Sequence, residues 1–120
     1  HYFHRVRTIN RQPLMLEKFY FPVSLFPSLE AIDFKNRSAY ELLKEHYGVV
    51  ITRAQQSLEA VTASEYEAEL LNIKIGAPLL LERRIGFDQS GRPVEYAKDL
   101  YRGDKIKFLL ETTLDDGGPL

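Results

Sequence analysis

Two arginines one residue apart, Arg5 and Arg7, are the first side chains in this 120-residue sequence whose spacing could serve chemistry. Residues two apart on a β-strand point to the same face, so a strand here would aim both guanidinium groups at one volume. Such a pair could hold an anion through bidentate hydrogen bonds. A solvated sheet face or a charged edge strand explains the same pair, and this alternative stays open.

Ser38 and Tyr40 form a second candidate anion site. Ser38 opens a helical run, SAYELLKEHYG, and Glu41 three residues later completes the pattern of a capping box. The first turn of a helix has free backbone N–H groups and a partial positive charge, which suit a phosphate or carboxylate. Tyr40 lies in that turn and could donate its hydroxyl to the same ligand. An ordinary cap at Ser38 and a partly buried core aromatic at Tyr40 are the alternatives.

Carboxylates and a phenol could hold the uncharged or amine-bearing part of a ligand. Glu95 and Tyr101 are six residues apart on one expected strand and therefore share a face, with Ala97 and Asp99 between them. Glu17 on an earlier strand adds a second carboxylate, and carboxylates with phenols suit the hydroxyl and amine groups of a sugar-like ligand. A strand whose polar face meets solvent is the alternative.

Composition excludes several other functions. Sixteen Lys plus Arg against seventeen Asp plus Glu give a net charge of −1, so the chain has no general attraction to nucleic acid or anionic lipid. The absence of cysteine excludes a disulfide framework and a thiolate metal site. The three histidines lack metal-ligand spacing, and no phosphate loop or nucleophile elbow is present. No apolar run is long enough for a membrane helix, and a start at His1 suggests a piece of a longer protein.

The chain begins with an expected β-hairpin. Residues 2–9 and 14–21 are rich in β-branched and aromatic side chains, and the Asn-Arg-Gln-Pro sequence between them is typical of a turn. A loop over residues 11–13 implies the following cross-strand pairs: Asn10 with Leu14, Arg7 with Glu17, and Arg5 with Phe19.

The remaining elements predict one α+β domain over residues 1–114. Two helices are expected, within residues 37–48 and 62–73, and the second has its own capping box at Ser64 and Glu67. Further strands are expected over residues 49–60, 79–87, 93–101 and 105–113. About six strands joined largely by short turns favour a mainly antiparallel sheet with flanking helices, followed by a frayed tail at residues 115–120.

In this order the motifs resemble the UTRA domain, the ligand-sensing module of the HutC subfamily of GntR-type bacterial transcription regulators. The resemblance covers about residues 4–110. Its most specific pieces are Arg-x-Arg followed ten residues later by Glu17 and then Tyr20-x-Pro22, the Ser-x-Tyr at 38–40, and DQSGRPVEYAKDLYRGD.

The resemblance implies a chorismate-lyase-like fold and a small-molecule effector. In the N-acetylglucosamine-type members the effector is a phosphorylated amino sugar, such as glucosamine 6-phosphate or N-acetylglucosamine 6-phosphate, whereas other members sense acids, phosphonates or fatty acids. Carried onto this sequence, the anion ligands are Arg5, Arg7, Ser38 and Tyr40, and the sugar or amine ligands are Glu17, Glu95 and Tyr101.

The resemblance also implies partners and a setting. Effector binding controls a winged helix-turn-helix domain that lies N-terminal to the sensor and is absent from this chain, so operator DNA would be contacted only through that domain. A cytoplasmic homodimer formed partly through sheet edges is expected, with no metal, cofactor, membrane contact or enzymatic activity. The rival expectations are a chorismate-lyase-like enzyme and a dimerisation module without a ligand.

Overall fold

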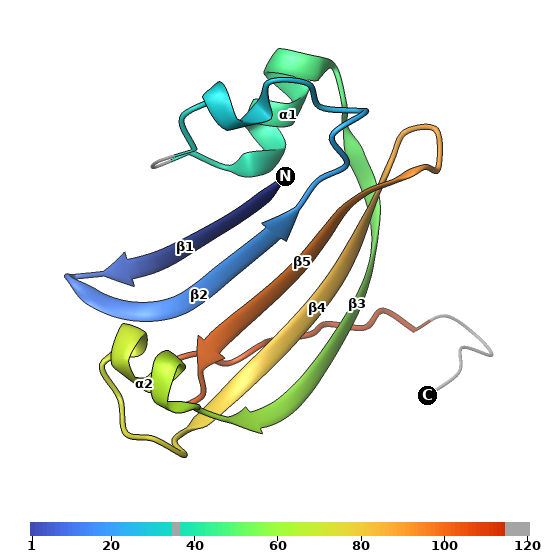
Figure 1. Cartoon of the computed structure of the whole chain (residues 1–120). Helices are drawn as coiled ribbons and strands as arrows, with labels where there is room; N and C mark the ends of the chain where they lie inside the picture. Colours follow the sequence, from blue (N-terminus) through green and yellow to red (C-terminus); the bar gives the residue numbers. More distant parts are fainter. Residues whose placement is uncertain (35–36, 115–120) are drawn as a thin grey trace.

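The computed structural model describes residues 1–34 and 37–114, which form one antiparallel sheet with helices on both faces (Figure 1). The five strands lie in the order β1-β2-β5-β4-β3. In chain order the elements are β1 (Tyr2–Ile9), β2 (Gln12–Tyr20), the 3₁₀ helix η1 (Leu29–Ala31), α1 (Ala39–Tyr47), β3 (Ile51–Thr62), α2 (Glu65–Leu71), β4 (Pro78–Asp88) and β5 (Pro93–Arg102). None of the helices in the described part is long and apolar enough to cross a membrane.

The first hairpin turns at Asn10 and Arg11 rather than through the predicted loop at residues 11–13. Both residues have positive φ angles, 51° and 65°, which a two-residue type I′ turn requires. The ladder then shifts between Arg7 and Thr8, where Leu14 is the extra residue on β2.

The predicted partners of Arg5 and Arg7 are therefore wrong by two residues, and the predicted pair of Asn10 with Leu14 does not form, because Asn10 lies in the turn and Leu14 is the extra residue. Arg5 lies opposite Glu17, and Arg7 lies opposite Met15. Side chains alternate between faces with a period of two, so an error of two residues leaves every side chain on its expected face. Arg5, Arg7 and Glu17 consequently share one face of the sheet, as the sequence predicted.

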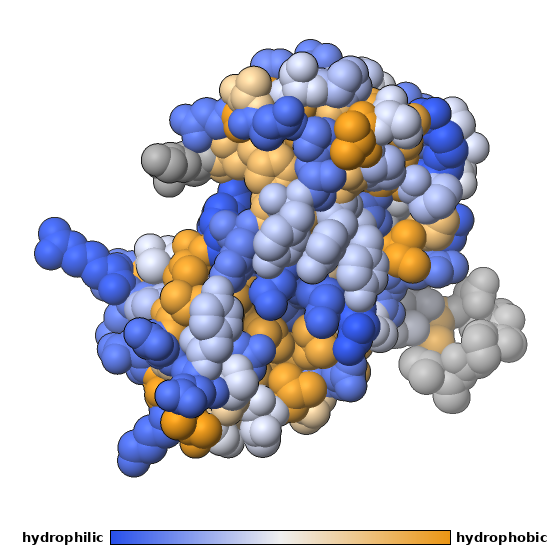
Figure 2. Space-filling model, viewed as in Figure 1, coloured by the Kyte–Doolittle hydropathy of each residue, from blue (hydrophilic) through white to orange (hydrophobic). Residues whose placement is uncertain are grey.

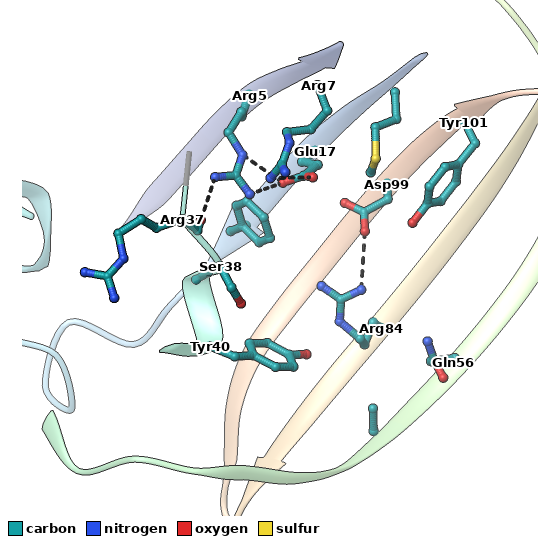
Figure 3. A pocket seen from close by; sticks show the side chains of 14 residues that line it. Arg5, Arg7, Glu17, Arg37, Ser38, Tyr40, Gln56, Arg84, Asp99 and Tyr101 are labelled. Atoms are coloured by element: carbon teal, nitrogen blue, oxygen red, sulfur yellow. Dashed lines mark hydrogen bonds and ion pairs between the residues drawn. The ribbon is translucent and has the colours of Figure 1, made fainter. Parts of the chain in front are cut away.

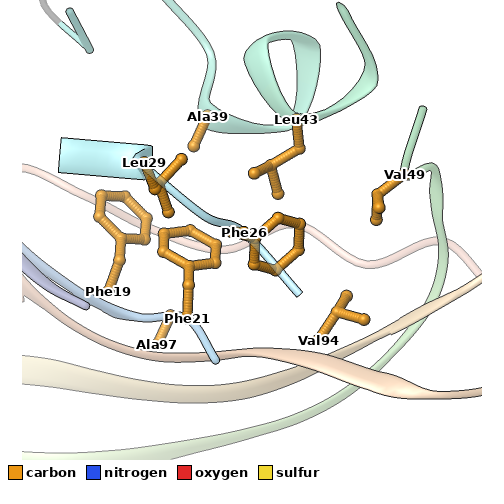
Figure 4. Close-up of a cluster of buried hydrophobic side chains, with 9 residues drawn as sticks. All are labelled: Phe19, Phe21, Phe26, Leu29, Ala39, Leu43, Val49, Val94 and Ala97. Carbon is orange, nitrogen blue, oxygen red and sulfur yellow. The ribbon is translucent and has the colours of Figure 1, made fainter. Parts of the chain in front are cut away.

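The 3₁₀ helix and α1 cover this face at one end of the sheet. Their apolar side chains meet aromatic and small residues of β2 and β5, with Phe26, Leu29 and Leu43 fully buried at the centre (Figure 4). The buried members of this cluster are Phe19, Phe21, Phe26, Leu29, Ala39, Leu43, Val49, Val94 and Ala97. Fixing α1 here determines where its N-terminus lies relative to the strands.

The opposite face is covered by α2. Leu16 is three residues from Phe19 on β2 and so faces the other side, where it packs with Leu71 of α2 and Leu81 of β4. Hydrophobic side chains gather around α2 in the lower part of Figure 2, and hydrophilic ones cross the middle of the sheet. The two faces thus carry separate cores, and α2 lies away from the face that holds the arginine pair.

One long edge of the sheet is uncovered. The twelve-residue strand β3 pairs only with β4 in the described residues, and all its side chains except Ile51 and Val61 are exposed. Long exposed edge strands favour pairing with another chain unless charges or prolines interrupt them. Only Arg53 and Glu59 in this strand are charged, and it has no proline.

A sixth strand does not form. Residues 105–113 were predicted as a strand, but they lie in turn and irregular backbone, with Leu109 and Leu110 nearly fully exposed. Strand propensity depends on a neighbouring strand to pair with, and this segment has none within the described chain. The predicted tail at 115–120 lies outside the described residues.

Both helices begin at the predicted N-cap residues, but only one of the two predicted capping boxes forms. Ser64 and Glu67 form the predicted reciprocal capping box of α2. Ser38 is the N-cap of α1, yet its side chain makes no cap hydrogen bond, so the box predicted with Glu41 is wrong. The Ser38 hydroxyl is therefore not used by the helix that it precedes.

This difference predicts unequal stability losses. Ser64→Ala removes a cap bond and should lower the free energy of unfolding by about 1 kcal/mol. Ser38→Ala removes no such bond and should cost less than about half of that. Urea denaturation of both variants measures the difference, and equal losses would contradict the cap assignment.

Candidate functional site

A cavity of about 530 Å³ opens between the N-terminus of α1 and the sheet (Figure 3). Residues from α1, from the segment before it and from all five strands line it. Six of the seven side chains predicted as effector ligands are among them: Arg5, Arg7, Glu17, Ser38, Tyr40 and Tyr101. The sequence thus predicted residues on both sides of the cavity, and the role of these residues in binding stays a prediction.

Arg5 is held by the protein itself. Its Nε donates to Glu17 Oε2 at 2.9 Å, and its Nη1 donates to the backbone carbonyl of Phe34 at 2.8 Å. A longer bond of 3.4 Å reaches the carbonyl of Arg37, one residue before the N-cap of α1. Arg5 therefore ties β1 to the segment that enters α1, and little of its hydrogen-bonding capacity is left for a ligand.

Arg7 is less constrained. Its side chain is 46% exposed, and its Nη1 lies 3.6 Å from Glu17 Oε1, beyond hydrogen-bond distance. Because Arg5 takes the other oxygen of Glu17, the carboxylate can orient Arg7 without occupying its donors. Arg7 is the more available of the two guanidinium groups.

Ser38 and the N-terminus of α1 border the same cavity as Arg7 (Figure 3). Ser38 is exposed, and its hydroxyl is free of any cap bond. The nine-residue helix α1 adds the partial positive charge of its first turn. A hydroxyl, backbone N–H groups and one guanidinium group thus meet at one side of the cavity, as an anion site requires.

Tyr40 and Glu95 lie deeper. The Tyr40 hydroxyl donates to Glu95 Oε1 at 2.8 Å, while the Glu95 side chain is fully buried and is not among the residues that line the cavity. Burial raises the pKa of Tyr40, and the adjacent Glu95 charge raises it further. The phenol therefore stays protonated and links α1 to β5, and Glu95 supports the site from beneath.

Arg84 on β4 lies at the centre of the site and was not predicted from the sequence as a site residue. Its guanidinium contacts three buried carboxylates, with 3.1 Å to Glu82, 3.2 Å to Glu95 and 3.3 Å to Asp99. Burial lowers the pKa of Arg84, but Glu95, Tyr40 and Asp99 together outweigh burial and raise the pKa above its usual value. Arg84 therefore remains charged, but one cation cannot balance the three carboxylates that it contacts.

Two carboxylates of this group, Glu95 and Asp99, each have one buried oxygen without a hydrogen-bond partner among the described residues, and only Asp99 lines the cavity. Its Oδ2 accepts from Arg84, whereas its Oδ1 is buried and has no hydrogen-bond partner among the described residues. Burial raises the pKa of Asp99 to about 7; Arg84 opposes the rise, and the charges of Glu17 and Glu82 add to it. Asp99 is thus divided between its neutral and ionised forms near neutral pH.

Tyr101 and Gln56 line the far wall of the cavity, the side away from Arg7, and both side chains contact Glu82. The Tyr101 hydroxyl lies 3.4 Å from Glu82 Oε1, and the Gln56 amide donates to Glu82 Oε2 at 2.9 Å. Burial raises the pKa of Tyr101, and Asp99 and Glu82 raise it further. This wall is rich in acceptors, in contrast to the donor-rich wall at Arg7 and Ser38.

A simple signal could have found part of the missed set. Glu82 and Arg84 are two residues apart on β4 and so share a face, as Arg5 and Arg7 do. Asp99 was placed on the face of Glu95 and Tyr101 but was not selected as a ligand.

No group of three His, Cys, Asp or Glu side chains suited to a metal ion occurs within residues 1–34 and 37–114.

Comparison with known proteins gives the family. The UTRA domain model matches residues 1–107. The chain is 37% identical to the HTH-type transcriptional repressor NagR of Bacillus subtilis over 105 residues, which are 88% of this chain and 43% of the relative. It is 33% identical to the mannosyl-D-glycerate transport/metabolism system repressor MngR of Escherichia coli over 106 residues, 88% of this chain and 44% of the relative.

A solved structure shows the same fold. PhnF from Mycobacterium smegmatis superposes with a TM-score of 0.89 at 25% identity, covering 95% of this chain and 50% of that one. This chain spans less than half the length of the curated relatives it matches. These relatives are transcription regulators, so the domain is a regulatory ligand-binding module and not an enzyme. By sequence and by fold, the chain belongs to the UTRA domain family found in GntR-family transcription regulators.

Proposed function

We propose that this domain binds a small anionic metabolite and thereby controls DNA binding by a winged helix-turn-helix domain in a GntR regulator of the HutC subfamily. The observation that carries the proposal is that Arg7 and Ser38, distant in sequence, border one cavity. The effector that fits best is a phosphorylated sugar or amino sugar, such as glucosamine 6-phosphate or N-acetylglucosamine 6-phosphate.

The anionic group would bind between Arg7 and the first turn of α1. Arg7 can turn its half-exposed guanidinium toward a ligand, and the free Ser38 hydroxyl lies beside the positive end of the helix. Arg5 would act mainly by holding Glu17 and the segment before α1 in place. Charge-assisted hydrogen bonds of this kind are stronger than neutral ones and suit a phosphate.

The rest of the cavity supports a sugar-sized ligand. Its volume of about 530 Å³ lies in the range usual for small-molecule sites. The carboxylates and phenols of the far wall are acceptors and donors suited to hydroxyl and amine groups. One relative is named as the repressor of a mannosyl-D-glycerate transport/metabolism system, which supports a sugar-related ligand.

Regulation would follow from a shift between two arrangements of a cytoplasmic dimer. A ligand moves such an equilibrium only by the difference between its affinities for the two states. Binding at the entry to α1 could supply that difference, because Arg5 and Tyr40 already connect this helix to the sheet.

The dimer would form through the uncovered edge of β3. If two copies pair antiparallel about Gln56, a two-fold axis places Arg53 of one protomer opposite Glu59 of its partner, twice. Opposed charges on neighbouring strands stabilise that register, and the pairing satisfies backbone groups that are otherwise unpaired. The edge is thus self-complementary in charge.

The anion site predicts a selective loss of binding. In calorimetry with glucosamine 6-phosphate, Arg7→Ala should weaken binding by about 1.5 to 3 kcal/mol, the range for a hydrogen bond to a charged group. Ser38→Glu should abolish binding, because it adds a like charge at the same position.

Arg92→Ala is the matched control, because Arg92 is a half-exposed arginine between β4 and β5 that pairs with Asp88 outside the cavity. Unchanged affinity in Arg7→Ala would remove that residue from the site. If neither sugar phosphates nor inorganic phosphate raise the melting temperature, the module has no anionic effector of this class.

The edge pairing predicts a charge-swap rescue. Arg53→Glu places two carboxylates opposite each other and should weaken the dimer by about tenfold or more in sedimentation velocity. Adding Glu59→Arg to the same chain should restore it. A dimer that is indifferent to Arg53→Glu would exclude this register, and a monomeric parent would exclude the dimer.

A further inference from the structure

Three carboxylates form a row across the middle of the sheet. Glu17 of β2 lies directly opposite Asp99 of β5, and Asp99 lies directly opposite Glu82 of β4. All three are buried, with 7%, 3% and 6% of their surface exposed. Like charges directly opposite one another on neighbouring strands are destabilising, and burial increases the cost.

The outer two carboxylates of the row have more hydrogen-bond donors than the middle one, Asp99. Glu17 has Arg5, and Glu82 has Arg84 together with Gln56. The charged and titratable groups facing Asp99 are Glu17 from β2, Glu82 and Arg84 from β4, and Tyr101 from its own strand. Arg84 is the one cation among them, and Glu82 and Glu95 share it.

The unpartnered oxygen of Asp99 belongs to a side chain of the cavity wall. Asp99 lines the cavity, and its Oδ1 meets neither solvent nor a donor within the described residues. The torsion about the bond to the carboxyl group is soft, so the carboxylate can reorient when a ligand binds. A buried acceptor without a donor is costly, and a donor that enters the cavity would remove that cost.

The two walls of the cavity therefore differ in sign. Arg7, Ser38 and the helix terminus favour an anion at one wall, whereas at the other wall Asp99 shares the single cation Arg84 with Glu82 and Glu95. A molecule with an anionic group and a separate cationic group would complement both walls. A ligand hydroxyl would also donate to Asp99, but only a protonated amine would in addition offset the negative charge there.

We propose that Asp99 determines effector specificity by accepting a hydrogen bond from a protonated amine of the ligand, while the anionic group of the same ligand binds at Arg7 and Ser38. The proposal rests on the proposed function and narrows it to a class: phosphorylated metabolites with a free amine, rather than their hydroxyl or N-acylated counterparts. Asp99 contacts the ligand directly, whereas Arg84 positions it.

Proton linkage supports this role. The pKa of Asp99 near 7 means that a bound ammonium group favours the ionised carboxylate and releases a proton. The preference for an amine over a hydroxyl should therefore increase as the pH rises through that pKa, as long as the amine stays protonated. The charge on the phosphate also changes with pH, but it is the same in both ligands and cancels in the ratio.

The experiment compares glucosamine 6-phosphate with glucose 6-phosphate by calorimetry at about pH 6 and about pH 7.5. The parent should prefer the amine by about tenfold or more at the higher pH, and less at the lower pH. Asp99→Asn should bind both ligands within about threefold of each other at both pH values. Asp104→Asn is the matched control, because Asp104 is half exposed and pairs with Arg102 after β5.

The outcomes separate this inference from the proposed function. A parent without a preference, or an Asp99→Asn variant that keeps the preference, overturns the role of Asp99 while leaving the anion site intact. Absence of binding by both sugar phosphates and by inorganic phosphate overturns both. Equal loss of the preference in Asp104→Asn would show that the effect is not specific to the cavity.

The pH dependence of the free energy of unfolding tests whether Asp99 is buried as a carboxylic acid with a raised pKa. Because folding raises the pKa of Asp99 from 3.8 to about 7, the folded state binds the extra proton, and stability is lost as the pH rises through this interval. Asp99→Asn lacks this loss, so its stability relative to the parent should increase from about pH 4 to about pH 7 in urea denaturation. A constant difference would contradict the burial on which the proposal depends.

Discussion

The charge of Arg84 is shared among three carboxylates, and the arrangement of β4, β5 and Tyr40 of α1 depends on that sharing. Glu82 comes from the same strand as Arg84, whereas Glu95 and Asp99 come from β5. Breaking a buried ion pair by removing one partner is far more costly than the pair is worth, because the remaining charge stays buried. The central strands must therefore keep their register, and α1 must keep Tyr40 on Glu95.

Two separate cores make this polar centre possible. One lies beneath α1 and η1, and the other beneath α2 on the opposite face, so apolar burial stabilises both ends of the sheet. Between them, the face that carries Arg5, Glu17 and Asp99 is left for polar side chains. The cavity lies beside the N-terminus of α1, where the helix no longer covers the sheet. The helix N-terminus and the strand carboxylates therefore border the same space.

Local patterns predicted the faces of the strands better than their partners. Arg5, Arg7 and Glu17 share a face whether or not the turn is placed correctly, because the error was of two residues. The spacing of Glu82 and Arg84 shows only that they share a face of β4. Their contacts with other carboxylates depend on β4 lying beside β5 and β5 beside β2, a strand order that no single segment encodes. The strand predicted at 105–113 failed for a related reason: a strand needs a neighbour, and the neighbour is a property of the whole sheet.

The edge strand connects the cavity to the surface proposed for dimerisation. Gln56 lines the cavity, donates to Glu82 in the carboxylate row, and lies at the centre of the self-complementary register of β3. A ligand that changes the charge on Asp99 alters the field at Glu82, one hydrogen bond away from that centre. Such a contact transmits regulation only if β3 has two arrangements that the ligand distinguishes, because a ligand with equal affinity for both shifts nothing. The shared residue therefore makes the pairing of the edge, rather than a movement of the core, the element on which an effector would act.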